Sequence, residues 1–163
     1  KKSIKNFNNF KFYVLTFDHS KKIVDEMLDG LNIKVLTNFD KKQLVMRKSF
    51  LAIAASGSVS LELCKYQVPS IIVYDTHFIT KLILKLFVKV NYASLLNIFY
   101  NKEVVPEYLF EKFNEKNVFS KLSELIKDEK KRSYQIKMMK NFSKKMLLNK
   151  NNPSEIIARS ILN

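Results

Sequence analysis

The sequence predicts an α/β protein in which a parallel sheet is flanked by helices, with a helical region at the C-terminal end. Strand-like and helix-like segments alternate over the first half of the chain, and a small-residue turn separates one strand from the helix that follows it. Apolar residues at helical spacing dominate the second half. With 163 residues, of which 47% are hydrophobic and 27% charged, the chain is long enough for a domain with its own core.

Each segment of the first half has its own signal. The predicted strands are rich in β-branched and aromatic or small apolar residues and cover 10–17, 32–37, 50–56 and 69–74, and the predicted helices between them cover 18–30, 40–49 and 58–66. Asp40 suits the N-cap of the second helix, and Gly30 suits the end of the first. The strand FLAIAAS (50–56) is small and apolar throughout, which predicts burial on both faces. Such alternation indicates βαβ units on a parallel sheet.

After residue 75 the pattern changes. Residues 78–90 have helical spacing, and NYASLLN (91–97) is predicted to be a strand that leads into a loop. The remainder is predicted to be helical, with helices over 114–127, 129–149 and 153–162. The N-terminal stretch lacks the features of a signal peptide, and no segment has the roughly 18 continuous apolar residues of a transmembrane helix.

The net charge of +14 favours an anionic partner, such as nucleic acid, an acidic membrane surface or a phosphorylated substrate. The alternative is that an AT-rich genome encodes Lys, Asn, Ile and Phe by default. The single cysteine, Cys64, excludes an internal disulfide and a multi-cysteine zinc site. No histidine lies near it in sequence, so Cys64 is predicted to be a small buried apolar residue and not a nucleophile.

The turn Ser56-Gly57-Ser58 follows the strand 50–56 directly. In a parallel sheet, ligands bind beyond the carboxyl ends of the strands, where the next helix points its free N–H groups outward. Gly57 permits a tight turn and close backbone approach, and the two serines add hydroxyl donors. The turn is therefore a candidate phosphate site, with an ordinary packed turn as the alternative.

Glu62 is the one acid of this helix, and the most common structural explanation does not fit it. A capping box places the acid three residues after the N-cap, and with Ser58 as the N-cap that position is Leu61. A carboxylate one turn above a phosphate site is instead suited to accept hydrogen bonds from a sugar diol.

Two blocks in this order, SGSVSLELCKYQVPSIIVY and KLFVKVNYASLLNIFYNKEVVPEYL, resemble the C-terminal half of bacterial lipid-A-disaccharide synthases. That family typically has small-Ser-Gly-Thr-x-x-Leu-Glu and then Val-Pro in the first block, and Val-Ser-Leu-Pro-Asn and then Val-Pro-Glu in the second. The matching residues are Ser56, Gly57, Leu61, Glu62, Pro69, Val88, Lys89, Tyr92, Ser94, Leu95, Asn97, Glu103, Val104, Val105, Pro106 and Glu107. The departures are Ser58 for Thr, Leu96 for Pro, and residues 100–102 for Ala-Gly-Arg.

The resemblance implies a glycosyltransferase of the GT-B type, with two Rossmann-like domains and no metal or cofactor. Such an enzyme transfers diacylglucosamine from UDP to diacylglucosamine 1-phosphate, and its C-terminal half holds the UDP. Residues 1–127 would then form the UDP-sugar-binding Rossmann-like domain, incomplete at its N-terminus. Residues 128–163 would be helices packed on it or on the N-terminal half.

By the family pattern, Glu62 binds the ribose hydroxyls, and Ser56, Gly57 and Ser58 face the diphosphate. Asn97 is implied to lie near the donor phosphates or sugar, and Asn97 and Glu103 are the candidates for a catalytic role. The alternatives are a turn residue for Asn97 and an ordinary first-turn helix acid for Glu103. Glu107 is expected to be structural.

Nine of the thirteen residues of the stretch 78–90 are apolar, and three lysines recur at every fourth position, which suits a helix lying on an anionic membrane. We expect Lys81, Lys85, Lys89 and Phe87 to contact lipid, with a core helix carrying solvated lysines as the alternative. The substrates implied by the family carry acyl chains, so the resemblance implies a cytoplasmic protein at the inner membrane surface.

The partners implied are the UDP-linked acylated sugar, the acylated sugar phosphate, the anionic inner membrane and an N-terminal domain that this sequence lacks. Without that domain we expect no transfer by this chain alone, and a homodimer stays open. Two rival functions remain: another UDP-sugar glycosyltransferase or epimerase of the same fold, and a non-catalytic basic module on a membrane surface. Nucleic acid is not an expected partner, because no interleaved aromatic and basic motif is present.

Overall fold

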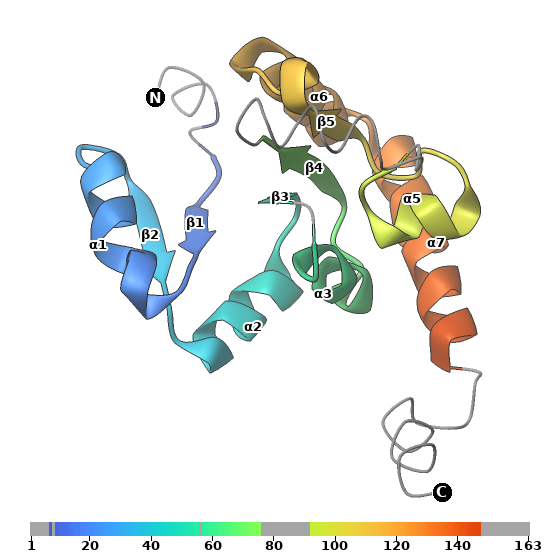
Figure 1. Cartoon of the computed structure of the whole chain (residues 1–163), viewed down its shortest axis with the longest axis horizontal. Coiled ribbons are helices and arrows are strands. Elements are labelled where there is room, and N and C mark those ends of the chain that lie inside the picture. Colours follow the sequence, from blue (N-terminus) through green and yellow to red (C-terminus); the bar gives the residue numbers. More distant parts are fainter. Residues whose placement is uncertain (1–6, 8, 56, 76–91, 148–163) are drawn as a thin grey trace, which may run out of the picture. The chain divides into compact units, whose positions relative to one another are not determined.

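A computed structural model describes residues 7, 9–55, 57–75 and 92–147 of the chain. The chain divides into two compact units, Lys1–Phe50 and Leu51–Asn163, which are described separately below (Figure 1). The predicted contact stretch 78–90 and the predicted helix 153–162 lie outside the described residues. The predicted boundary at residue 127 falls within the second unit, between two helices that pack together, and it stays a prediction.

The first unit is a strand–helix–strand–helix segment that follows the predicted order. Its elements are β1 (Phe12–Leu15), α1 (Asp18–Met27), β2 (Ile33–Leu36) and α2 (Phe39–Lys48). The two strands pair in parallel, from Phe12 opposite Ile33 to Leu15 opposite Leu36. The prediction of a parallel βαβ unit is confirmed here.

The ends of the two helices are set by single residues. Gly30 has a φ of +72°, a backbone conformation that glycine adopts at little cost, and it lies in the turn that follows α1. The N-cap of α2 is Asn38, whose Oδ1 accepts a hydrogen bond from the Lys41 N–H at 3.0 Å. The prediction that Asp40 caps this helix was wrong. Asp40 lies in the first turn, where a carboxylate favours the positive end of the helix dipole.

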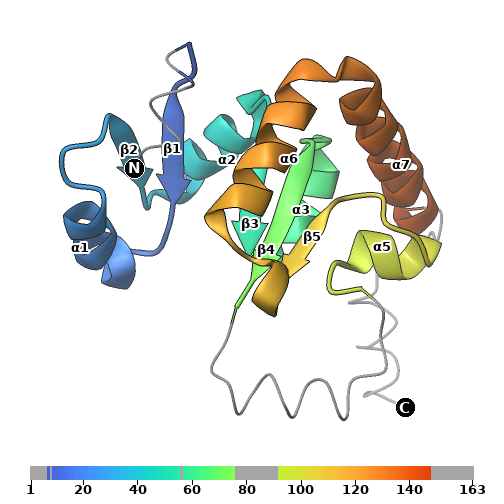
Figure 2. The same ribbon diagram turned by 90° about the horizontal axis from the view of Figure 1, so that it is seen from above.

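The second unit is a three-stranded parallel sheet with helices on both faces. Its strands lie in the order β3-β4-β5, and Figures 1 and 2 show α3 and α6 on opposite sides of this sheet. The elements are β3 (Ala52–Ala55), α3 (Val59–Tyr66), β4 (Ser70–Tyr74), α5 (Leu95–Tyr100), β5 (Glu107–Leu109), the 3-10 helix η2 (Phe110–Lys112), α6 (Glu115–Lys127) and α7 (Glu129–Leu147). The prediction of an α/β protein with a parallel sheet and C-terminal helices is confirmed.

The core of this unit lies around the central strand β4. Ile71 and Ile72 of β4 are fully buried, and Leu63 of α3, Leu125 of α6 and Met139 of α7 are almost completely buried. A buried polar pair fixes α7 to the sheet, since the Ser70 N–H donates to Gln135 Oε1 at 2.8 Å and both residues are buried. Because each buried backbone donor needs a partner, this bond sets the position of α7 along β4.

Two predictions for this unit were wrong, and one strand was not predicted. Strand 50–56 was predicted to be buried on both faces, but of β3 only Ala54 is buried, and the Ile53 side chain is 49% exposed. The physical reason is that β3 is an edge strand of its sheet. Residues 91–97 were predicted to be a strand, but α5 begins at Leu95, and the short strand β5 was not predicted.

Cys64 lies in α3 with only 2% of its surface exposed. Burial raises the pKa of its thiol from the ordinary value of 9.0 to about 11. The thiol therefore stays protonated at neutral pH, which agrees with the prediction of a small buried apolar residue. Within the described ranges, no helix has both the length and the apolar composition needed to cross a bilayer.

Candidate nucleotide site

The turn after β3 leads directly into α3, as the sequence predicts. Gly57 has a φ of +132°, and a Cβ built on it would meet no heavy atom within 4 Å. The backbone conformation, and not a lack of space, therefore selects glycine here. The buried Ser60 hydroxyl donates to the Gly57 carbonyl oxygen at 2.7 Å and ties the turn to the first helical turn.

The N-terminus of α3 is open. Ser58 is the N-cap residue but its side chain caps no N–H group. Gly57, Ser58 and Val59 are exposed, and among the described residues no acceptor binds the backbone N–H groups of Ser58 and Val59. Free N–H groups at the positive end of a helix dipole are suited to bind an anion. Ser56, the first residue of the predicted phosphate turn, lies outside the described residues.

Glu62 lies in the first turn of α3, exposed to solvent. Within the part of the chain that the structure describes, its carboxylate forms no hydrogen bond and no ion pair. The helix begins where the capping argument assumed, so Glu62 is not part of a capping box. The carboxylate is free to accept hydrogen bonds from a ligand held at the same helix end.

Asn97 has a different environment. Its side chain is fully buried, and all of its hydrogen-bonding capacity is used inside the unit. The Oδ1 atom accepts from the N–H groups of Val104 and Val105 at 2.7 and 3.0 Å, and the Nδ2 atom donates to the Val105 carbonyl oxygen at 2.8 Å and to Glu107 Oε1 at 2.7 Å. Asn97 therefore holds the segment 103–107 against α5, and its predicted contact with the donor stays a prediction.

Glu107 completes this network. Its carboxylate accepts hydrogen bonds from the backbone N–H groups of Ala93 and Ser94, at 2.7 and 2.8 Å, besides the one from Asn97. Ser94 caps α5, because its Oγ accepts from the Asn97 N–H at 3.3 Å. The N-terminus of α5 is thus occupied by a carboxylate of the protein itself, whereas that of α3 is open. These bonds agree with the expectation that Glu107 has a structural role.

Glu103 is exposed and lies in the loop between α5 and β5. The alternative that it is a first-turn helix acid was wrong, because no helix begins there. The structure brings α3 and α5 into contact, so the open helix end and Asn97 belong to neighbouring helices, and Glu103 lies in the loop that follows α5. The predicted lipid contacts Lys81, Lys85, Lys89 and Phe87 lie outside the described residues.

Sequence reasoning missed the network around Glu107. Ser94 directly before the apolar Leu95 and Leu96 is a local sign of a helix start, and it could have revealed α5. The bonds of Glu107 have no local signal, because they join residues 10 to 14 positions apart in the chain. Among the described residues, no group of three or more His, Cys, Asp and Glu side chains could hold a metal ion, and the absence of a metal stays an expectation.

Parallel strands, helices on both faces and an open helix N-terminus after an edge strand define a Rossmann-like α/β protein, a class that binds nucleotides beyond the carboxyl ends of its strands. Comparison with known proteins gives the particular family. The family model for lipid-A-disaccharide synthetase matches residues 1–161. The chain belongs to the lipid-A-disaccharide synthase family, a family of glycosyltransferases of lipid A biosynthesis.

Individual relatives agree with the family model. The lipid-A-disaccharide synthase of Rickettsia prowazekii is 28% identical over 145 residues, which cover 89% of this chain and 38% of that protein. The probable mitochondrial lipid-A-disaccharide synthase of Arabidopsis thaliana is 39% identical over 85 residues, covering 52% of this chain and 18% of that protein. The chain thus spans about two fifths or less of the length of these relatives.

Proposed function

We propose that this chain is the part of a lipid-A-disaccharide synthase that binds the donor nucleotide, UDP. The observation that carries the proposal is the pairing, on one short helix, of an open N-terminus with a free carboxylate. The N–H groups of Ser58 and Val59 would bind the diphosphate, and Glu62 would accept hydrogen bonds from the ribose hydroxyls. The occupied N-terminus of α5 supports the choice of α3 over its neighbour.

In the full reaction, diacylglucosamine would pass from UDP to diacylglucosamine 1-phosphate, with UDP as the leaving group. The role that we assign to this chain is to hold the diphosphate while its negative charge develops. Fixed N–H groups are suited to this role because they stabilise such charge without reorganising. Glu103, exposed on the loop that Asn97 holds, is the acid that we assign to the donor sugar.

We further propose that this chain alone binds UDP and transfers no sugar. The relatives are more than twice as long as the segment that matches this chain, and acceptor binding is assigned to the remainder. Mixing the chain with both substrates should therefore release no UDP. Turnover by the isolated chain would overturn this assignment of parts.

The Glu62→Ala substitution tests the nucleotide site. We expect the dissociation constant for UDP to rise by a factor of about 5 to 150, the equivalent of losing a charged hydrogen-bond acceptor worth roughly 1–3 kcal/mol. Glu62→Gln keeps one acceptor oxygen and should lie between the wild type and Glu62→Ala. Isothermal titration of UDP into the 163-residue chain measures both.

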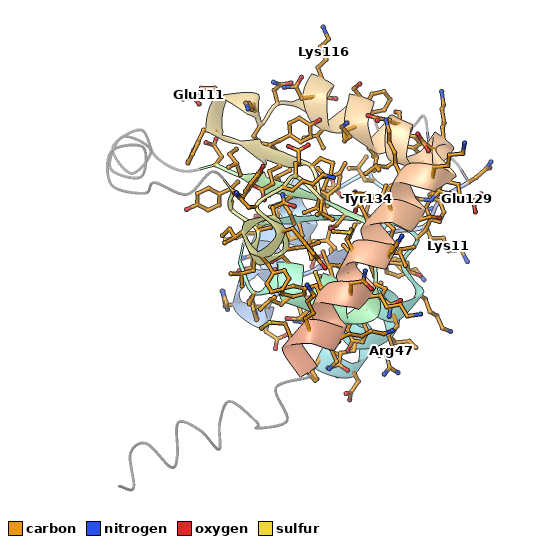
Figure 3. The ribbon with its side chains drawn as sticks, turned by 90° about the vertical axis from the view of Figure 1, so that its right-hand side faces the viewer. Lys11, Arg47, Glu111, Lys116, Glu129 and Tyr134 are labelled. Atoms are coloured by element: carbon orange, nitrogen blue, oxygen red, sulfur yellow. The ribbon has the colours of Figure 1, made fainter. Side chains whose placement is uncertain are left out.

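Glu129→Ala is the matched control, because Glu129 is an exposed acid in the first turn of α7, on another helix of the same unit (Figure 3). It changes the net charge equally and should leave the UDP affinity unchanged. Equal effects of the two alanine substitutions would show a general charge effect, and an unchanged affinity in Glu62→Ala would remove the ribose assignment.

A further inference from the structure

Helix α5 lies along the second half of α7. The Phe99 ring packs edge-on against the Phe142 ring, with 5.1 Å between their centroids, and the Tyr100 hydroxyl donates to the Met138 carbonyl oxygen at 3.2 Å. Lys145 Nζ lies 5.5 Å from the Phe99 ring centroid. Side chains from the two helices therefore form one continuous surface.

This surface combines exposed apolar side chains with lysines. We call it the α5–α7 surface and define it by Ile98, Phe99, Lys102, Tyr134, Lys137 and Lys145. Ile98 is 40% exposed and Phe99 43%. The Lys102 Nζ atom lies 5.3 Å from the centroid of the Tyr134 ring, which joins the end of α5 to the middle of α7. Figure 3 shows where Tyr134 lies on α7.

The positive charge of the α5–α7 surface is not compensated by α7 itself. Residues 133–147 of α7 contain four lysines and no acid. Lys137 and Lys145 form no ion pair with a described residue. The start of the helix differs, because there Lys131 pairs with Glu124 and Asp128. The lysines beside the apolar side chains are thus available to an external anionic partner.

We propose that the α5–α7 surface binds the surface of an anionic lipid bilayer. Lysine stems cover apolar surface while their ammonium groups stay in water, so Ile98 and Phe99 could enter the acyl boundary with the lysines at the headgroups. Each such lysine contributes about 1 kcal/mol near an anionic leaflet. Nucleic acid is the less suitable partner, since the surface carries an exposed aliphatic side chain, Ile98, and none of its six residues is an arginine.

This surface is separate from the stretch 78–90 that the sequence predicts to contact lipid, and it consists of described residues only. It also leaves the proposed nucleotide site untouched, because none of its six residues lies on α3. Failure of UDP binding and failure of bilayer binding can therefore be told apart in the same set of variants.

The test is sedimentation of the 163-residue chain with vesicles of phosphatidylglycerol and phosphatidylcholine, compared with phosphatidylcholine alone. The surface variant carries Lys102→Gln, Lys137→Gln and Lys145→Gln, and we expect its partition coefficient on anionic vesicles to fall on the order of 100-fold at low salt. The control variant carries Lys112→Gln, Lys116→Gln and Lys127→Gln, at exposed positions of η2 and α6, and should lose far less. Figure 3 shows Lys116 among them.

A third variant, Ile98→Ser, keeps the charge and tests the apolar contact. It should weaken binding to anionic vesicles about fivefold, since one aliphatic side chain no longer leaves water. Circular dichroism and UDP titration check that each variant is folded. An unchanged partition of Ile98→Ser would overturn the insertion of this face.

Three other results would overturn the proposal. The first is that the wild type does not bind anionic vesicles. The second is that the surface and control variants lose equal amounts of vesicle affinity. The third is that the surface variant keeps its vesicle affinity but loses affinity for an oligonucleotide. The last result would assign the lysines to nucleic acid.

Discussion

Replacing Asn97 by alanine is expected to lower the free energy of unfolding by about 3 kcal/mol or more. The change removes the acceptor of the Val104 and Val105 N–H groups and the donor to the Val105 carbonyl oxygen and Glu107. These groups are mostly buried, so alanine leaves them without water or a protein partner. Urea unfolding followed by circular dichroism measures the loss.

The matched control is Asn141→Ala, the same change at an exposed position of α7. It should alter the unfolding free energy by no more than about 0.5 kcal/mol, because a surface helix position tolerates alanine. A similar small effect for Asn97→Ala would show that the network does not hold the loop.

Asn97→Asp adds a pH signature to this prediction. The new carboxylate still accepts from the Val104 and Val105 N–H groups but faces the Glu107 carboxylate, now without a donor between them. Two close carboxylates cannot both ionise cheaply, so the destabilisation should be greatest at neutral pH. It should shrink as the pH falls through the carboxyl range, since one shared proton restores the bond. A pH-independent loss would contradict this account.

Replacing Ile72 by alanine is expected to cost about 2–5 kcal/mol of unfolding free energy. Ile72 is fully buried on the central strand β4, and its backbone N–H donates to the Pro106 carbonyl oxygen at 2.9 Å. The substitution leaves a cavity under the helices that flank the sheet, and these pack too tightly to fill it. With total stabilities near 5–15 kcal/mol, this is a large fraction of the whole.

Ile98→Ala is the matched control for this cavity, since Ile98 is 40% exposed on α5. Its expected cost is below about 1 kcal/mol, because little surface is buried and alanine favours helix. Thermal unfolding of both variants at the same pH checks the pair. Equal costs would mean that β4 is not the core of this unit.

How much the sequence predicts depends on how local the cause is. The strand, turn and helix from 50 to 66 were predictable because Gly57 and the small apolar run before it act within a few residues. The helices α6 and α7 were predictable from their spacing. Strand β5 has three residues and exists through its pairing with β4, far away in sequence, so no local pattern could reveal it.

The candidate site also has features with a local cause, which the sequence predicts, and features with a distant cause, which it does not. The open N-terminus of α3 and the position of Glu62 follow from the register of one helix. The burial of Asn97 follows from Val104, Val105 and Glu107, which approach only once the loop has folded back. The family resemblance placed Asn97 in the right motif, and the structure adds the reason why an amide is needed there: one side chain must both donate and accept.

The most direct measurement of the central claim is the position of UDP on the chain, observed as chemical-shift changes of backbone amides during a UDP titration. We expect saturable changes at Gly57, Ser58 and Val59, with a smaller response to uridine, which lacks the diphosphate. Changes confined to the lysines of α7, or a response that never saturates, would contradict a nucleotide site at the N-terminus of α3.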